Sequence, residues 1–335
     1  MSLKPQEMKE KTKGIFHLAL TPFDKNGDLN IPALKESVRL VTTNKDLDGE
    51  DIVFIALGTT GEFYAMSEAE NKTVIDIITA EVNGKFPVVI GTGRAGTKNT
   101  IEMSKYAQSA GADGLLIVHP YYTMPTTEGV IKHFEAVAEA VDIGIIIYNN
   151  PAASKIWLPM PAIKRLSKVD NIIGLKENTN NPNAFLSMLQ NIDPKDMEIF
   201  AGLGHFMYQY MCFHGCSGYV TEMINYAPHL ALDLYHAGKE GDIKKVRETA
   251  DKMNLFWNWV FRLAAKYSPV PSAVHASKDI PTDMPYYQAA NKLAAELCGM
   301  PAGFARAPME NIPEDEIPEL RTILKEMGCN VVKQV

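Results

Sequence analysis

The sequence is poor in cysteine and carries no excess of positive charge. Its four cysteines, Cys212, Cys216, Cys298 and Cys329, are too sparse among 335 residues to form a disulfide framework. Lys and Arg together number 33 against 40 Asp and Glu, which gives a net charge of −7. That balance offers no electrostatic footprint for nucleic acid or for an anionic membrane. We therefore expect neither a disulfide-stapled domain nor a nucleic-acid-binding protein.

Long hydrophobic runs and metal-ligand spacings are missing as well. No apolar run is long enough to span a bilayer, and no basic segment followed by an apolar one opens the chain. Cys212 and Cys216 flank His214 but lack a second ligand pair at zinc-finger spacing, and the histidines share no ligand spacing. The sequence thus predicts a cytoplasmic protein with reduced thiols and without a metal site.

Short apolar runs recur regularly through the first 240 residues. They cover residues 15–20, 52–57, 88–91, 115–118, 143–148, 172–175, 199–201 and 218–220. Stretches with helical periodicity separate them, for example 68–82, 100–110 and 129–141. This alternation indicates parallel βα units.

Eight βα units suit a closed (β/α)8 TIM barrel, which typically takes about 250 residues. An open doubly wound sheet is the rival fold. It requires a glycine fingerprint after the first strand, where this chain has Thr21-Pro22-Phe23. The pattern therefore favours the barrel.

Beyond the eighth run the pattern is wholly helical. Helices are expected at residues 230–237, 243–266, 286–298 and 314–327, with breaks at Pro269, Pro271 and Pro281. We predict a barrel domain over residues 1–240 and a C-terminal α-helical extension over residues 241–335.

In such a barrel, function is carried by residues at the carboxyl ends of the strands. The second run ends in Gly58-Thr59-Thr60-Gly61-Glu62, where two glycines flank two hydroxyls. The backbone there can supply N–H donors to an anion such as a carboxylate. A tight turn capped by threonine explains the same residues, so both interpretations stay open.

A lysine and several tyrosines end the neighbouring runs. Lys176 closes the sixth run, and a lysine in the mouth of a barrel has a lowered pKa and a nucleophilic amine. The alternative is a lysine that reaches out to the rim. Tyr121, Tyr122 and Tyr148 end the fourth and fifth runs and can pack or relay protons. Their presence beside the apolar sixth run favours catalysis.

Taken in order and spacing, these motifs resemble the dihydrodipicolinate synthase/N-acetylneuraminate lyase family. The resemblance rests on Gly58-Thr59-Thr60-Gly61-Glu62, Pro120-Tyr121-Tyr122, Tyr148-Asn149-x-Pro151 and Gly174-Leu175-Lys176-Glu177. It continues through Thr21-Pro22-Phe23, Gly215-x-x-Gly218-Tyr219-Val220 and Gly303-Phe304-Ala305-Arg306-Ala307-Pro308, and so covers nearly the whole chain. It implies a lyase, a metal-independent class I aldolase that condenses or releases pyruvate through a lysine Schiff base.

The resemblance also assigns catalytic roles. Lys176 becomes the Schiff-base lysine and Tyr148 the general acid/base beside it. Thr59 links Tyr148 to Tyr122, which in the family reaches across a tight dimer interface into the neighbouring site. A neutral lysine amine attacks the pyruvate ketone, and the resulting iminium acidifies the methyl group.

Substrate binding and assembly follow from the same resemblance. The N–H groups of Thr59 and Thr60 would hold the pyruvate carboxylate, and Val220 matches a position whose carbonyl lines the pocket. The implied ligands are a 2-keto acid and an aldehyde, with no metal and no cofactor besides the lysine imine. The implied assembly is a homo-oligomer, a homotetramer built as a dimer of dimers.

One position departs from the synthase pattern. Where synthases carry an arginine for the aldehyde's carboxylate, this chain has Ala153 within Pro151-Ala152-Ala153-Ser154. That stretch is closer to the lyases that cleave sialic acid, whereas Thr59-Thr60 is closer to the synthases. A 2-keto-3-deoxy sugar acid aldolase, dehydratase or hydratase-aldolase is a further alternative, and a pyruvate-binding barrel is the non-enzymatic one. Without the arginine fork, we predict that aspartate semialdehyde is a poor partner.

Overall fold

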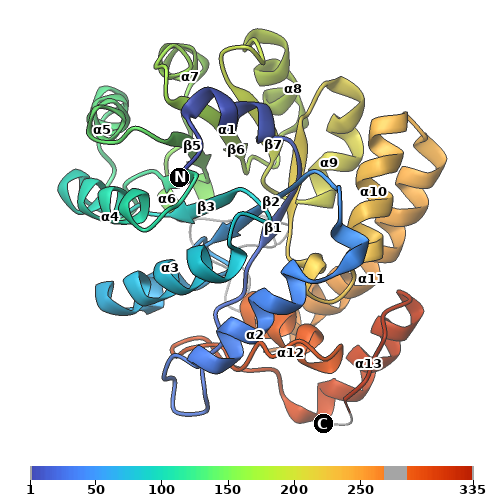
Figure 1. The fold of residues 1–335 in the computed structure, drawn as a ribbon. Helices are drawn as coiled ribbons and strands as arrows, with labels where there is room; N and C mark the ends of the chain where they lie inside the picture. Colours follow the sequence, from blue (N-terminus) through green and yellow to red (C-terminus); the bar gives the residue numbers. More distant parts are fainter. Residues whose placement is uncertain (1, 268–284, 334–335) are drawn as a thin grey trace.

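A closed barrel of eight parallel strands, paired in chain order from β1 to β8 and back to β1, forms the centre of the protein (Figure 1). The structure is a computed structural model that describes residues 2–267 and 285–333. The predicted (β/α)8 barrel is confirmed. The strands are β1 Gly14–Leu18, β2 Ile52–Ala56, β3 Val88–Gly91, β4 Gly114–Val118, β5 Gly144–Asn149, β6 Ile172–Glu177, β7 Glu198–Ala201 and β8 Gly218–Thr221.

Helices surround this barrel and continue beyond it (Figure 1). The helices up to the eighth βα unit are α1 Pro5–Lys11, α2 Ile31–Thr42, α3 Glu68–Val82, α4 Thr97–Ser109, α5 Thr127–Ala140, α6 Pro151–Ser154, α7 Met160–Leu166, α8 Pro182–Asn191, α9 His205–Met211 and α10 Pro228–Glu240. The C-terminal extension contains α11 Ile243–Tyr267, α12 Tyr287–Leu297 and α13 Ile317–Glu326. Short 3₁₀ turns are η1 Lys45–Leu47, η2 Phe63–Ala65, η3 Cys212–His214, η4 Met223–Asn225 and η6 Glu314–Glu316.

The observed boundaries differ from the predicted ones in both directions, since β1 ends at Leu18, two residues before the end of its predicted run. Strand β6 continues two residues past the apolar run 172–175, and Lys176 is paired within the sheet near its end, as expected for a lysine that closes the strand. Helices α2, α7 and α8 begin at Asx caps or proline starts that apolar periodicity does not reveal. The predicted breaks at Pro269, Pro271 and Pro281 lie outside the described residues.

Helix α1 closes the amino end of the barrel. Its Met8 is fully buried and belongs to the cluster of side chains that fills the barrel interior. The Met8 side chain lies against Gly114 and Gly144, which begin β4 and β5. Because the amino end is packed in this way, the carboxyl ends of the strands are the open face of the barrel.

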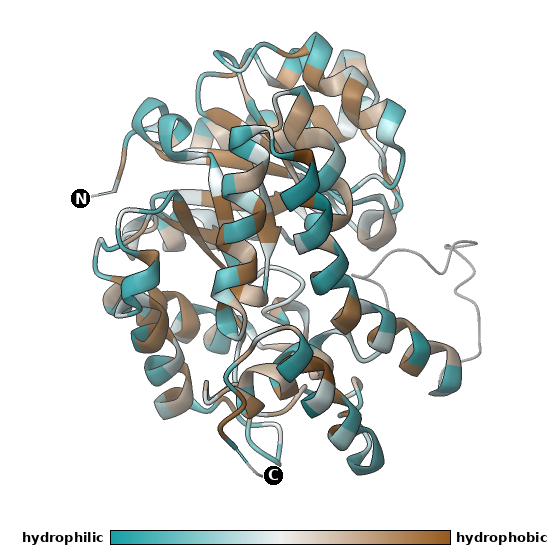
Figure 2. Ribbon diagram, turned by 90° about the vertical axis from the view of Figure 1, so that its right-hand side faces the viewer, coloured by the Kyte–Doolittle hydropathy of each residue, from teal (hydrophilic) through white to brown (hydrophobic). Residues whose placement is uncertain are grey.

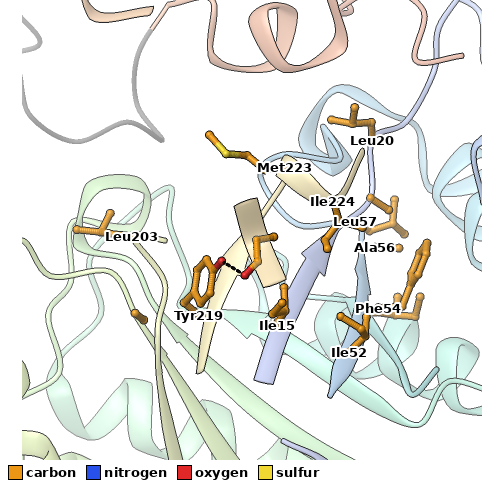
Figure 3. Packing of buried hydrophobic residues seen from close by; sticks show 14 of the residues in the cluster. Ile15, Leu20, Ile52, Phe54, Ala56, Leu57, Leu203, Tyr219, Met223 and Ile224 are labelled. Atoms are coloured by element: carbon orange, nitrogen blue, oxygen red, sulfur yellow. Dashed lines mark hydrogen bonds between the residues drawn. The ribbon is translucent and has the colours of Figure 1, made fainter. Parts of the chain in front are cut away.

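Two hydrophobic clusters hold the layers together. The interior cluster includes Phe16 and Phe200, whose stacked rings have centroids 3.7 Å apart. The outer cluster lies between the strands and the helices, and hydrophobic residues accordingly gather on the strands and on the inward helix faces (Figure 2). Figure 3 shows part of it, where the hydroxyl of Tyr219 donates to the carbonyl of Ala231 at 2.8 Å.

A buried ion pair fastens the C-terminal extension to the barrel. Lys292 of α12 pairs with Glu62, which follows the Gly58–Gly61 turn in a left-handed conformation with φ of 55°. The other carboxylate oxygen of Glu62 accepts a hydrogen bond from the main-chain N–H of Arg306 at 2.9 Å. The outer hydrophobic cluster also includes residues of both regions. The boundary at residue 240 stays a prediction.

None of the helices in residues 2–267 and 285–333 combines the length and the apolar sequence that a bilayer crossing requires.

Candidate active site

Lys176 and Tyr148 lie side by side at the carboxyl ends of β6 and β5. They are register partners across the two strands, and the Lys176 Nζ lies 4.0 Å from the centroid of the Tyr148 ring. The next register pair, Asn149 and Glu177, is also fully buried, and the Asn149 Nδ2 donates to the Glu177 carboxyl at 2.6 Å. Because successive residues of a strand alternate between its faces, this second pair faces away from Lys176 and fixes the register beside it.

A small cavity of about 30 Å³ encloses the Lys176 side chain. Lys176 is only 3% exposed, and burial lowers the pKa of its amine to about 7, although the charge of Glu222 acts in the opposite direction. The cavity walls come from strand ends, α9 and the C-terminal extension, and comprise Leu18, Thr60, Tyr148, Lys176, Gly202, Leu203, Gly204, His205, Phe206, Val220, Thr221, Glu222, Trp257 and Tyr287. About half of the Lys176 amines are therefore uncharged near neutral pH.

The Tyr148 hydroxyl is oriented by the loop that follows its strand. Asn150 Nδ2 donates to this hydroxyl at 3.0 Å, while Asn150 Oδ1 accepts from the Ala153 N–H at 3.3 Å and so caps α6. A phenol that accepts this bond keeps its own proton for donation elsewhere. Tyr148 is thus placed as a proton carrier beside the lysine.

The two adjacent threonines of the Gly58–Glu62 turn line different cavities. Thr60 lines the Lys176 cavity, and its hydroxyl shares a hydrogen bond of 2.8 Å with the hydroxyl of Tyr287. Thr59 lines a larger cavity on the other side, and its carbonyl accepts from the Gln288 side chain at 3.4 Å. The structure therefore brings Thr60, not Thr59, to the cavity that holds Lys176 and Tyr148.

Val220 and Tyr122 occupy contrasting positions. Val220 is buried on β8 and lines the Lys176 cavity. Tyr122 lies in the loop after β4, is 82% exposed and lines neither cavity in the described part of the chain. Its preceding neighbour, Tyr121, lines the larger cavity instead. Within a single chain, Tyr122 is not part of the cluster around Lys176.

The larger cavity has a volume of about 600 Å³ and lies directly beside the Lys176 cavity. Thr59 and Tyr286 line the larger cavity, whereas their neighbours Thr60 and Tyr287 line the Lys176 cavity. The hydrogen bond between Thr60 and Tyr287 therefore lies in the wall that the two cavities share. The described part of its lining comprises Thr59, Phe63, Tyr64, Val118, Tyr121, Ala153, Tyr267, Pro285, Tyr286, Gln288, Pro308, Met309 and Glu310. It is mostly aromatic and apolar and includes no lysine or arginine.

Three titratable lining residues of the Lys176 cavity were not predicted from the sequence. Glu222 directly follows β8, so the rule of strand ends identifies it once the end of that strand is known. His205 begins α9, and burial lowers its pKa to about 4, which leaves the ring neutral. Tyr287 belongs to α12 of the extension, and no signal in the sequence connects it with the barrel mouth. Across the described residues, no group of three His, Cys, Asp or Glu side chains is arranged to hold a metal ion.

Comparison with known proteins agrees with this geometry. The sequence profile of the dihydrodipicolinate synthetase family matches residues 11–282. The chain belongs to this family. A relative from Methanococcoides burtonii named 4-hydroxy-tetrahydrodipicolinate synthase is 31% identical over 320 residues, which are 95% of this chain and 99% of the relative. A synthase of the same name from Methanopyrus kandleri is 31% identical over 94% of this chain and 96% of its own length.

Solved structures of the family share the fold. The dihydrodipicolinate synthase of Aquifex aeolicus superposes with a TM-score of 0.79 at 26% identity, over 96% of this chain and 100% of the other. YagE of Escherichia coli, a prophage protein of the family solved in complex with pyruvate, gives a TM-score of 0.80 at 25% identity, over 95% and 99%. The protein is therefore a lyase of the class I, pyruvate-dependent, Schiff-base-forming aldolases.

Proposed function

We propose that Lys176 forms the Schiff base with pyruvate and that Tyr148 moves protons beside it. The observation that carries this proposal is the burial of the Lys176 amine in a small cavity, 4.0 Å from the Tyr148 ring centroid, with a pKa of about 7. An amine that is partly uncharged near neutral pH can attack a ketone, whereas an ordinary lysine is almost entirely protonated there. No metal and no separate cofactor is needed for this chemistry.

The steps follow from the residues around the lysine. The Lys176 nitrogen bonds to the ketone carbon, the carbonyl oxygen leaves as water, and the iminium that remains draws electrons from the adjacent methyl group. Loss of a methyl proton then gives an enamine that attacks the carbonyl carbon of an aldehyde. Tyr148 is placed to protonate the new alkoxide, and the reverse sequence releases pyruvate. The N–H groups of Thr59 and Thr60 are our proposed ligands of the pyruvate carboxylate, and we propose that the Val220 carbonyl lines the same pocket.

The larger cavity supports an uncharged aldehyde as the second substrate. The Glu310 carboxylate accepts from the Tyr286 hydroxyl at 3.1 Å and is the charged group of the described lining. Ala153 also lines this cavity, at the position where the synthases that the chain resembles carry an arginine. Among the described lining residues, an acidic aldehyde would meet aromatic rings and a carboxylate, with no cation to pair with. An aldehyde with an apolar or hydroxylated body fits this lining better.

Two alternative substrates use the same lysine. A 2-keto-3-deoxy acid, cleaved or dehydrated through Lys176, needs hydroxyl-binding groups, which the tyrosines of the larger cavity can provide. N-acetylneuraminate is the other alternative. Release of pyruvate from a panel of such acids, measured beside condensation with a panel of aldehydes, ranks these substrates directly by kcat/KM.

We also propose that the protein assembles at least as a dimer, and as a dimer of dimers in its full form. The 82% exposure of Tyr122, a residue of a family motif, supports a role that only a neighbouring subunit can complete. Sedimentation at assay concentration checks this, since a fully active monomer contradicts it. One solved relative is described as a monomeric dihydrodipicolinate synthase variant, so the state has to be measured for each member. A cytoplasmic location likewise stays a prediction.

The decisive experiment is trapping with pyruvate and sodium borohydride. We expect the intact mass of the wild-type protein to rise by one reduced pyruvate per chain. The Lys176→Arg variant should gain none, because a guanidinium remains protonated and cannot attack a ketone. Lys164→Arg, which changes an exposed lysine on α7, is the matched control and should be trapped like the wild type. Trapping of Lys176→Arg at the wild-type rate would refute the proposal.

A further inference from the structure

Glu222 is a buried carboxyl group that faces the Lys176 cavity. It directly follows β8, is 6% exposed and lines the cavity together with Lys176 and Tyr148. Its main chain is fixed independently of the side chain, because its carbonyl accepts from the Asn225 Nδ2 at 2.7 Å and from the Asn225 N–H at 3.0 Å. The same Asn225 Nδ2 also donates to the Leu18 carbonyl of β1 at 3.0 Å. The backbone of Glu222 is therefore held at the mouth of the barrel, where the residue lines the cavity of Lys176.

The partners of other buried carboxyls show that Glu222 is different. Glu62 pairs with Lys292 and accepts from the Arg306 N–H. Glu177 accepts from the Asn149 side chain at 2.6 Å and from the Thr179 N–H at 2.7 Å. The Glu222 carboxyl accepts from its own main-chain N–H; in the described part of the chain no arginine forms an ion pair with it, and the cation that acts on it electrostatically is Lys176. A carboxyl with these surroundings serves the cavity more directly than it serves the fold.

We propose that Glu222 is a second catalytic acid/base of this site, which takes a proton from the Lys176 ammonium and returns it to the oxygen that leaves the substrate. This inference rests on the proposed function of Lys176. Burial raises the pKa of Glu222 to about 7, while Lys176 opposes the shift, so both groups titrate in the same range. A proton can therefore pass between them at little cost in free energy.

The proton and electron balance of the step is complete. Transfer from the ammonium gives a neutral amine and a neutral carboxylic acid. The amine nitrogen bonds to the ketone carbon, and its proton moves to the oxygen, which yields a carbinolamine. Glu222 then protonates the hydroxyl, the C–O bond breaks, water leaves, and the nitrogen lone pair forms the C=N bond. The carboxylate that remains lies beside the new iminium and neutralises its charge.

The test measures how fast the imine forms. Protein and pyruvate are mixed, quenched with borohydride at successive times, and the adduct is quantified by intact mass over a pH series. We expect Glu222→Gln to slow imine formation about 100-fold, a typical contribution of general acid–base catalysis. Because the Glu222 charge raises the pKa of Lys176, its removal should also move the acid limb of the rate profile to lower pH. Glu222→Asp should recover part of the rate.

The control is Glu198→Gln, which changes a half-buried carboxyl with a raised pKa at the amino end of β7 and should leave the rate unchanged. A Glu222→Gln variant that forms the imine at the wild-type rate overturns the inference and leaves the role of Lys176 intact. A slower rate without the downward shift of the acid limb also overturns it, since it indicates only a misplaced lysine. A wild type that gains no adduct would instead refute the proposed function itself.

Discussion

Lys176 and Lys292 are both buried lysines, and the protein uses them in opposite ways. Lys292 is 1% exposed and Lys176 is 3% exposed, and burial lowers the pKa of each, to about 8 and about 7. Lys292 forms an ion pair with Glu62 and donates to the Phe304 carbonyl at 2.7 Å. Within the described residues, the Lys176 ammonium lies over the face of Tyr148 and forms no ion pair at salt-bridge distance, and the Glu222 carboxyl acts on it only through its charge. Equal burial thus yields a structural cation in one place and a reactive amine in the other.

The difference teaches that partners, not depth, decide what a buried lysine does. A desolvated charge whose hydrogen bonds are satisfied stays charged and holds its neighbours together. A desolvated amine that is not held in an ion pair loses its proton readily and is free to react. Lys292 joins the extension to the Gly58–Glu62 turn, and that turn supplies Thr60 to the reactive lysine. The structural lysine therefore supports the reactive one.

The largest effect that separates the two lysines is on catalysis. Lys176→Met should lower the rate of pyruvate-dependent turnover by about 10⁴-fold or more, since it removes the nucleophile. Lys292→Met should retain most of the turnover of each folded molecule. Steady-state assays on both variants, normalised to folded protein, make the measurement. A similar loss in both would remove the distinction between the two lysines.

For the free energy of unfolding, the replacement of Lys292 should have the larger effect of the two. Lys292→Met leaves the Glu62 carboxylate buried without its cation and should lower the free energy of unfolding by about 3–5 kcal/mol. Lys176→Met replaces a poorly satisfied amine by an apolar side chain and should leave stability unchanged or raise it. Urea denaturation followed by circular dichroism checks both. A Lys176→Met variant that is the less stable of the two contradicts this account.

Adding a cation at the barrel mouth extends the comparison to the second substrate. Ala153→Arg should improve kcat/KM for aspartate semialdehyde about 10- to 100-fold relative to an uncharged aldehyde, which is the value of one charged hydrogen bond. Ala153→Met has a similar length without the charge and serves as the control. Equal gains with arginine and methionine would show that side-chain size, not charge, limits the reaction.

The smallest effect concerns pH. Since the pKa of Lys176 is lowered to about 7, the fraction of free amine should rise through neutrality and level off at mildly alkaline pH. The rate of imine formation should fall about tenfold for each pH unit below that range, as the amine is protonated. An initial-rate profile of borohydride trapping measures it. A rate that keeps rising toward the pKa of an ordinary lysine would show that Lys176 is not desolvated in solution.

The sequence predicted the barrel because strand and helix periodicities alternate, and it singled out Lys176, Tyr148 and Thr60 because they end strands. Val220 followed only from the family resemblance. It assigned Thr59 to the same cavity, whereas the turn points Thr59 to the larger one. Contacts between segments far apart in the sequence could not be predicted, because local residue patterns do not show which segments pack together. Tyr287 forms a hydrogen bond with Thr60, which lies 227 positions away in the sequence. Lys292 likewise forms an ion pair with the distant residue Glu62.

The most direct test of the central claim is a peptide map of the wild-type protein after trapping with pyruvate and borohydride. Both buried lysines are present in one sample, so each serves as the control for the other. The account predicts that the reduced pyruvate adduct is found on the peptide that contains Lys176 and that Lys292 stays unmodified. An adduct on Lys292, or on any lysine in place of Lys176, would contradict it.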